Sequence, residues 1–458
     1  MFCQRLPCVQ SLGFTEMGSK SMRCVPAVFW LLLTGSAVVF GESPDAHPNI
    51  IFILADDLGV GNVGCYGSDR YRTPQIDRLA QSGLRYTRAY TAPLCGPSRA
   101  LLLTGRYAFR TGATNQDRVG LLQPDRETLL PVYLKQAGYR TAAFGKWSQF
   151  SLQPSDWGFD EYLRFSGSGV YRSTPDNSES YVKNGSKLIL SPDQYMPDLL
   201  HENVVDFISR HQNEPFFVYY SLSSVHGDLL PTPDSAADSS DLMADNIAYM
   251  DKLIGRLVTE LRKLDLDRRT VLVFMGDNGT GKGQADRATI GGQRLVGQKG
   301  TMQEGGSLVP LIVSWPGVIT AGQVADGVMD SSDFLPTFAE LAGIQLPSDR
   351  VFDGRSLAAQ WRGTAGQPRD WAFVQLARNW YVRERNWKLN QQGELFDMRQ
   401  SPFAEALIAA NQETDESRGA RRRLQAVLDS LKPAAGILDD GDGTGRHASK
   451  SRRDEPKE

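Results

Sequence analysis

The chain has 458 residues, of which 41% are hydrophobic and 22% charged, and its formal net charge is −3. This balance is typical of a globular protein with a sizeable core and excludes a disordered or fibrous chain. The mild acidity, without any basic stripe, also gives no reason to expect nucleic acid as a partner.

The N-terminal segment has the pattern of an export signal. An apolar stretch, residues 25–40, follows Lys20 and Arg23 and is too short to span a bilayer. Small residues up to Gly41 suit a cleavage site after that position. We therefore predict that residues 1–41 are a signal peptide, that the mature protein is periplasmic or secreted, and that it has no membrane contact after cleavage.

Short apolar runs alternate with helical stretches from residue 49 onward, which predicts an α/β fold with a mostly parallel sheet covered by helices. Because ligand sites in open α/β sheets lie at the carboxyl ends of the strands, we expect the polar groups that follow these runs to converge. Residues 243–264 have apolar positions three and four apart and predict a long covering helix. The four runs are NIIFIL (49–54), RTAAF (140–144), PFFVYYSL (215–222) and TVLVFM (270–275).

Acidic and amide side chains follow two of these runs. Asp56 and Asp57 come after the first, and Asp277 and Asn278 after the fourth. Hard oxygen ligands suit Ca²⁺ or Mg²⁺ rather than zinc. Taken singly, each pair could be a solvated or tight turn, but their shared position after apolar strands favours a metal site.

The stretch LGVGNVG (58–64) spaces three glycines as in a dinucleotide-binding fingerprint. That fingerprint requires a helix to open directly after the strand. Here Asp56 and Asp57 intervene and would repel a pyrophosphate, and no helical period follows. We therefore do not expect a nicotinamide- or flavin-dependent oxidoreductase.

The stretch PLCGPSRALLLTGR (93–106) places Cys95 at the start of a predicted helix, which Pro97 helps to begin and Gly105 ends. After signal cleavage, only Cys65 and Cys95 remain, so no disulfide framework is expected. The N-terminus of a helix lowers the pKa of a thiol, so Cys95 could be a nucleophile paired with His226. The alternative is a buried, inert cysteine.

The C-terminal part has a different texture. Four short strand-like pieces, WAFVQL, WYVRER, WKLNQ and ELFDM, predict a small antiparallel sheet, and a helix near residues 424–431 would pack on it. We expect this α+β subdomain to span residues 366–435. Residues 436–458 are almost devoid of apolar side chains and are predicted to be a disordered tail.

The segment from Cys95 to Arg99, followed by LLTGR (102–106), resembles the signature of the sulfatases in the alkaline phosphatase superfamily. The resemblance continues through most of the mature chain with DDLGVGNVGCYG, GYRTAAFGKW, GDNG and GQKGTMQEGGSLVP. It implies an alkaline phosphatase-like fold, with a large mixed, mostly parallel sheet sandwiched by helices, for a catalytic domain at residues 42–365. It also implies a sulfuric ester hydrolase whose Cys95 is converted to formylglycine by a formylglycine-generating enzyme.

The same resemblance implies a divalent cation, Ca²⁺ or alternatively Mg²⁺. Its ligands would be Asp56, Asp57, Asp277 and Asn278, with the modified Cys95 and a sulfate oxygen completing the shell. All four protein ligands follow predicted strands. The expected substrate is a sulfated small molecule or, preferably, a sulfated carbohydrate.

Further catalytic roles follow from the resemblance. Arg99 and Lys146 would steady the formylglycine and the sulfate, while His226 and Lys299 would hold sulfate oxygens and help the leaving alcohol depart. In the mechanism that the resemblance implies, a hydroxyl of the hydrated aldehyde, activated by the metal and by Asp277 as base, attacks sulfur and expels the alcohol, which leaves a sulfated intermediate. The second hydroxyl then loses its proton, the aldehyde re-forms and sulfate leaves.

The sequence departs from the family pattern at one position. Most relatives carry a histidine two residues after the lysine, where GKWSQF has Ser148. In the family, that histidine accepts the proton of the second hydroxyl, so we count Ser148 among the catalytic positions. Because a serine is a poorer proton acceptor, one alternative is a catalytically impaired relative that binds sugar sulfates. A phosphodiesterase or phosphonate hydrolase on the same scaffold is another, but only His226 among the histidines ends a strand, which favours one metal and sulfate.

Overall fold

Strand β1 (Asn49–Ala55) lies inside a large sheet and is completely buried. Phe52 and Leu54 belong to the core on one face of the sheet, whereas Ile51 and Ile53 belong to the core on the other. Successive side chains of a strand point to opposite faces, so a strand that is apolar throughout requires cover on both. This is the pattern that predicts a helix-sheet-helix sandwich.

The structure is a computed structural model, and it describes residues 47–147, 150–165, 171–172, 181–191, 194–439 and 441. The predicted signal peptide (1–41) and Ser148 lie outside the described residues. The described residues belong to one compact unit that begins at His47. The division into two domains at residue 365 stays a prediction.

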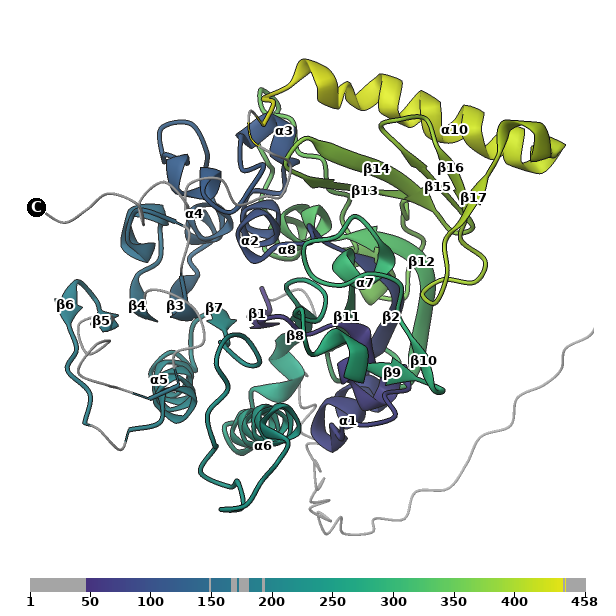
Figure 1. Cartoon of the computed structure of the whole chain (residues 1–458). Helices are drawn as coiled ribbons and strands as arrows, with labels where there is room; N and C mark the ends of the chain where they lie inside the picture. The colour runs from purple at the N-terminus through teal and green to yellow at the C-terminus, as the bar shows by residue number, and fades with distance from the viewer. Residues whose placement is uncertain are drawn as a thin grey trace, which may run out of the picture. The chain divides into compact units, whose positions relative to one another are not determined.

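The large sheet has ten strands in the order β12-β2-β11-β8-β1-β7-β3-β4-β5-β6 (Figure 1). The central strands β8, β1, β7, β3 and β4 are parallel to one another, whereas β11 is antiparallel to both of its neighbours. The expected mixed, mostly parallel sheet is therefore confirmed. The bounds are β2 (Leu84–Tyr90), β3 (Arg140–Lys146), β4 (Glu161–Phe165), β5 (Tyr181–Lys183), β6 (Ser186–Lys187), β7 (Phe216–Ser221), β8 (Thr270–Gly276), β11 (Leu308–Ser314) and β12 (Gln323–Asp330).

Helices cover both faces of this sheet (Figure 1). One face carries α2 (Cys95–Thr104), α4 (Leu130–Gln136), α8 (Phe334–Leu341) and α9 (Ala358–Trp361). The other face carries α1 (Pro74–Ser82), α5 (Met196–Arg210) and α6 (Leu242–Lys263), the last being the predicted long helix. Shorter elements are α3 (Ala108–Thr111), α7 (Glu304–Ser307) and the hairpin of β9 (Thr289–Ile290) with β10 (Gln293–Arg294).

A second sheet lies in the C-terminal part and is antiparallel throughout, which confirms the prediction. Helix α10 (Asp415–Leu431) packs on it through Leu424 and Leu428 (Figure 1). The helix begins well before the predicted residues 424–431, because the side chain of Thr414 accepts a hydrogen bond from Ser417 N and so caps its start. The strands are β13 (Trp371–Leu376), β14 (Asn379–Glu384), β15 (Trp387–Asn390), β16 (Leu395–Asp397) and β17 (Ala406–Ile408).

Contacts continue beyond the predicted start of the tail at Gly436. Ile437 N donates a hydrogen bond of 2.7 Å to the carbonyl oxygen of Phe109, in α3. Two residues later Asp439 is buried, with 6% of its surface exposed. The first residues after Gly436 are therefore held against the domain.

Candidate active site

The pairing of β1 with β8 brings the four predicted metal ligands together. Ala55 lies opposite Gly276 at the carboxyl ends of these parallel strands, so the residues that follow them emerge side by side. Asp57 N donates to Asp277 Oδ1 (3.0 Å), and Asn278 Nδ2 donates to Asp57 Oδ1 (2.8 Å). All of these side chains are buried.

Asp57 has a backbone conformation that few residues adopt. Its φ is +60°, in the left-handed region, which costs about 1–2 kcal/mol for residues other than glycine and is tolerated best by Asp and Asn. The turn that results points the Asp57 amide at Asp277. The three carboxylates of Asp56, Asp57 and Asp277, called the carboxylate cluster below, are thus held together by the backbone as well as by side chains.

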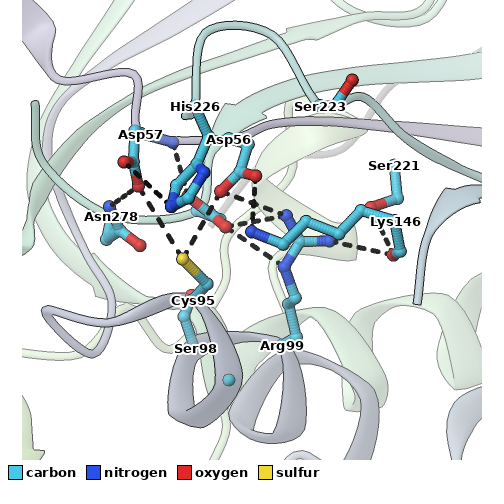
Figure 2. Close-up of polar contacts among 12 residues, drawn as sticks. Asp56, Asp57, Cys95, Ser98, Arg99, Lys146, Ser221, Ser223, His226 and Asn278 are labelled. Atoms are coloured by element: carbon cyan, nitrogen blue, oxygen red, sulfur yellow. Dashed lines mark hydrogen bonds and ion pairs between the residues drawn. The ribbon is translucent and has the colours of Figure 1, made fainter. Parts of the chain in front are cut away.

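Cys95 is the first residue of α2, as predicted, and its side chain points into the carboxylate cluster (Figure 2). The Sγ atom is 3.4 Å from Asp56 Oδ1 and 3.7 Å from Asp57 Oδ1. Burial raises the pKa of the Cys95 thiol well above its usual value; Lys146 opposes this, and Asp277, Asp56 and Asp57 reinforce it. Burial, reinforced by these carboxylates, thus opposes the lowering of the thiol pKa that we expected from its position at the start of a helix.

Arg99 lies one turn further along α2 and ties three elements together (Figure 2). Its Nη2 and Nε donate to Asp277 Oδ2 (2.7 and 3.1 Å), and its Nη1 donates to Ser221 Oγ at the end of β7. Ser221 Oγ donates in turn to the carbonyl oxygen of Lys146 (2.9 Å). Lys146 Nζ lies 2.5 Å from Asp56 Oδ2. These cations are fixed in place by buried partners.

The buried charges shift one another's proton affinities. Burial by itself would raise the pKa of Asp56, but the positive charges of Lys146 and Arg99 outweigh it and the pKa is lowered. Burial and the Asp56 carboxylate raise the pKa of Asp277, although Arg99 and Lys146 oppose the rise. Lys299 adds a third cation, with Nζ 2.6 Å from Asp57 Oδ1, so three basic side chains face three carboxylates.

His226 and Lys299 lie on the solvent side of the cluster. The side chain of His226 is 20% exposed and that of Lys299 is 7% exposed, whereas Arg99 is 1% exposed. His226 Nε2 is 3.6 Å from Asp57 Oδ2, and burial lowers its pKa against the pull of Asp56 and Asp57. Among the basic side chains around the carboxylates, His226 is thus the most exposed.

The structure brings together every predicted site residue that it describes, namely Asp56, Asp57, Cys95, Arg99, Lys146, His226, Asp277, Asn278 and Lys299. Sequence reasoning gave no role to Ser221, although it is the second-to-last residue of the run PFFVYYSL (215–222). Tyr171 also lies close to the site, since its hydroxyl donates to the carbonyl oxygens of Ser223 and His226 (both 3.1 Å). The signal available in the sequence was a tyrosine within a mostly polar segment, whereas its burial is known only from the structure.

The glycines of LGVGNVG serve close packing. A Cβ at Gly59 would lie 2.6 Å from Thr280 Oγ1, and one at Gly61 would lie 2.4 Å from the carbonyl oxygen of Ala288. Both distances are too short for a side chain. These glycines let the loop approach the segment after β8, which explains their spacing without a nucleotide.

The sulfatase family profile matches residues 48–344, well over half of the chain. The chain belongs to the sulfatase family. This sulfatase is 30% identical to steryl-sulfatase of Homo sapiens over 434 residues, covering 75% of this chain and 74% of that protein. It is 33% identical to N-acetylgalactosamine-6-sulfatase of Sus scrofa over 359 residues, covering 71% and 68%. It is a sulfuric ester hydrolase.

Among solved structures, the sulfatase is similar to Ps i-CgsB, with a TM-score of 0.73, 27% identity, and coverage of 87% of this chain and 96% of that one. The same protein is known in complex with k-i-k-neocarrahexaose. The likeness confirms the alkaline phosphatase-like fold. No helix in the described part of the chain is long and apolar enough to cross a membrane.

The residues present fit a divalent cation. One ligand atom from each of Asp56, Asp57, Cys95 and Asp277 lies within 4.8 Å of the others. Asn278 Oδ1 is buried and has no hydrogen-bond partner among the described residues, which is unusual for an amide oxygen and suits a metal ligand. Carboxylate and amide oxygens are the donors that Ca²⁺ and Mg²⁺ prefer.

Proposed function

We propose that this sulfatase hydrolyses sulfate esters of carbohydrates with a formylglycine derived from Cys95 and a divalent cation, Ca²⁺ or alternatively Mg²⁺. The observation that carries the proposal is the position of Cys95, whose Sγ faces two buried carboxylates within 3.7 Å. Carbohydrate is favoured because the similar Ps i-CgsB binds k-i-k-neocarrahexaose and another relative is an N-acetylgalactosamine-6-sulfatase.

Asp56, Asp57, Asp277 and Asn278 would hold the cation. Three carboxylates and three basic side chains nearly balance, so a bound divalent ion leaves the site positive and attractive to a sulfate anion. When bound, the cation supplies Lewis-acid stabilisation of negative charge next to the sulfuryl group. Formylglycine supplies, as its hydrate, the hydroxyl that attacks sulfur.

The chain's own cations bind and orient the sulfate. Arg99 and Lys146 are held rigidly by buried partners, so they require no rearrangement as charge develops on the sulfuryl oxygens. Lys299 and His226, on the solvent side, would contact the remaining oxygens, and His226 would donate a proton toward the leaving alcohol oxygen. The Asp277 carboxylate would accept the proton of the attacking hydroxyl.

The proposal includes maturation and location. Residues 1–41 would direct export to the periplasm or the exterior, and a formylglycine-generating enzyme would convert Cys95. Ser148 would take part in the last proton transfer in place of the usual histidine. These statements rest on the sequence.

Mass spectrometry of the peptide that contains Cys95, joined to sulfate-release assays, tests the proposal. Protein from a host with the modifying enzyme is expected to carry the aldehyde at Cys95, to release sulfate from an aryl sulfate and to act faster on sulfated oligosaccharides. The Cys95→Ala variant is expected to lose at least about 1,000-fold in kcat, since it removes the nucleophile.

Cys65→Ala is the matched control, because Cys65 is the other free cysteine among the described residues and lies outside the carboxylate cluster. It is expected to keep wild-type activity. An intact thiol in an active enzyme, or full activity of Cys95→Ala, would overturn the formylglycine mechanism. A higher kcat/KM for aryl sulfates than for every sulfated sugar tried would overturn the substrate class.

A further inference from the structure

Asp439 is a buried carboxylate in the segment that follows the small subdomain. Its Oδ2 accepts hydrogen bonds from Thr114 Oγ1 (2.8 Å) and from Asn115 Nδ2, and its Oδ1 accepts one from Gly441 N (3.0 Å). Thr114 and Asn115 are themselves completely buried. A charged group at this depth is tolerated because donors satisfy it, so the contact is specific.

The chain between Gly436 and Asp439 passes α3. Ile437 N donates to the carbonyl oxygen of Phe109, and the C-terminal end of α10 lies next to α3 (Figure 1). The turn between β13 and β14 also contacts the loop after α3, since Ala377 N donates a hydrogen bond to the carbonyl oxygen of Thr114 (2.6 Å). The loop after α3 is therefore clamped by two parts of the C-terminal region.

Asn115 hydrogen-bonds both to Asp439 and to the residues that follow it in the loop. While its Nδ2 donates to Asp439, its Oδ1 accepts hydrogen bonds from Asp117 N and Arg118 N (both 2.9 Å). The intervening residue, Gln116, is thereby fixed at the tip of a tight turn. Gln116 is half-buried and its side chain leaves the turn.

The Gln116 side chain ends at the first turn of α2. Its Oε1 accepts a hydrogen bond of 3.0 Å from Gly96 N, the residue after Cys95. Backbone N–H groups in the first turn of a helix lack partners within the helix, so an external acceptor fixes the orientation of that turn. A series of contacts through Asn115 and Gln116 thus connects Asp439 with the residue that follows Cys95.

We propose that Asp439 is a positioning residue of the active site, which acts through Asn115 and Gln116 on the backbone that carries Cys95. The proposal rests on the proposed function only in taking Cys95 as the source of the nucleophile. It gives the segment after Gly436 a part in catalysis. A nucleophile displaced by a fraction of an ångström loses rate without loss of substrate binding.

The test compares steady-state kinetics of Asp439→Asn, Gln116→Leu and the double variant with wild type on an aryl sulfate. Asp439→Asn places an amide N–H₂ where two donors now converge, and we expect kcat to fall about tenfold while KM stays within about twofold. Gln116→Leu is expected to have a similar effect. If the two act in one chain, the double variant is no slower than Gln116→Leu alone.

Asp429→Asn is the matched control, since it removes the same charge from an exposed position of α10 and should leave kcat unchanged. Asp439→Glu, which keeps the carboxylate, should recover part of the lost rate. An unchanged kcat in Asp439→Asn, or effects that multiply in the double variant, would overturn the proposal. If Asp439→Asn does not fold, an unchanged kcat in Gln116→Leu overturns it alone.

Cys95→Ala, measured in parallel, separates this inference from the proposed function. Full activity of Cys95→Ala would contradict the formylglycine mechanism itself. Loss of activity in Cys95→Ala together with a wild-type rate in Asp439→Asn would contradict only the positioning role.

Discussion

At the scale of single residues, Arg99 shows how the site depends on geometry as well as charge. Its planar group donates to Asp277 on one side and to Ser221 on the other. A lysine carries the same charge but cannot make both contacts from one position. Residue 99 can therefore contact Asp277 and Ser221 together only as an arginine.

We predict that Arg99→Lys lowers kcat/KM for sulfate-ester hydrolysis about 100-fold, because Asp277 loses its paired contacts and the fixed positive charge moves. Steady-state kinetics on an aryl sulfate would measure this. Arg78→Lys, at an exposed position of α1, is the control and should leave kcat/KM unchanged. Equal activity of both variants would contradict the role given to Arg99.

Asn278 allows a direct test of the cation site. We predict that Asn278→Ala weakens Ca²⁺ binding at least about tenfold, because the one neutral oxygen ligand is lost. Isothermal titration calorimetry of metal-depleted protein would measure the affinity. Asn379→Ala, in strand β14 of the small sheet, is the control, and equal Ca²⁺ affinity in the two variants would exclude Asn278 as a ligand.

The sequence allowed us to predict site residues that lie next to a recognisable pattern, such as an apolar run or a helix start. Asp56 and Asp277 directly follow apolar runs, and Cys95 begins a helix with a specific signature. The structure places them together, while their roles stay predictions. Ser221 and Gln116 could not be found in this way, because their importance lies in hydrogen bonds to elements far away in the chain.

At the scale of elements, helix α1 is capped by a residue of another helix. Asp251, in α6, accepts hydrogen bonds from Gln75 N (3.0 Å) and Ile76 N (2.8 Å) in the first turn of α1. Burial raises the pKa of Asp251 from 3.8 to about 6, although the two backbone amides oppose the rise. The cap thus binds a proton more tightly in the folded protein than in the unfolded chain.

This shift predicts the direction of a pH effect on stability. The stabilisation from proton binding at Asp251 is complete below pH 3.8 and is lost as the pH rises to about 6. Asp251→Asn keeps an acceptor oxygen but cannot titrate, so the fall in the free energy of unfolding over this range should be smaller than in wild type. Urea denaturation at several pH values would measure it.

Asp251→Ala separates capping from titration. It removes the acceptor and is predicted to lower the free energy of unfolding by about 1–2 kcal/mol at pH 7 relative to Asp251→Asn. The same pH dependence in Asp251→Asn as in wild type would show that another group titrates. Equal stability of the Ala and Asn variants would show that the cap contributes nothing.

Six strands of the large sheet, β2, β4, β5, β6, β11 and β12, were not among the predicted runs, and two of them show why. Strand β11 contains Pro310, which has no N–H to donate, and its pairing with β2 shifts register between Val309 and Leu311. Strand β12 is an edge strand whose first residues are largely exposed and polar. Strands β8, β1, β7 and β3 were predictable because burial on both faces makes them continuously apolar.

At the scale of the whole molecule, a buried ion pair joins the small sheet to the large one. Glu304, in α7, pairs with Arg383 of β14 (2.9 Å) and accepts a hydrogen bond from the Tyr90 hydroxyl of β2. Both charged side chains are completely buried. Burial would raise the pKa of Glu304, but Arg383 outweighs it and holds that pKa below its usual value.

We predict that Glu304→Gln lowers the free energy of unfolding by about 3–5 kcal/mol, because the Arg383 guanidinium is left buried without a counter-charge. Denaturation in urea would measure the loss. Glu384→Gln breaks the pair with Arg423, whose side chain is 60% exposed, and should cost less than about 1 kcal/mol. Equal losses in the two variants would mean that burial does not determine the strength of the link.

The hydrogen bond from Asp57 N to Asp277 Oδ1 joins residues 220 positions apart in the chain. No local segment can form the carboxylate cluster, since Asp277 joins Asp56 and Asp57 only when β1 and β8 are aligned side by side. Folding and ligand binding are therefore linked: a divalent cation that binds only the folded cluster stabilises the large sheet by an amount that grows with the logarithm of its concentration. A chain that stalls before this long-range pairing has no site at all. If the cluster binds Ca²⁺ as proposed, calcium in the folding medium would therefore favour the completed sheet over every partly folded form.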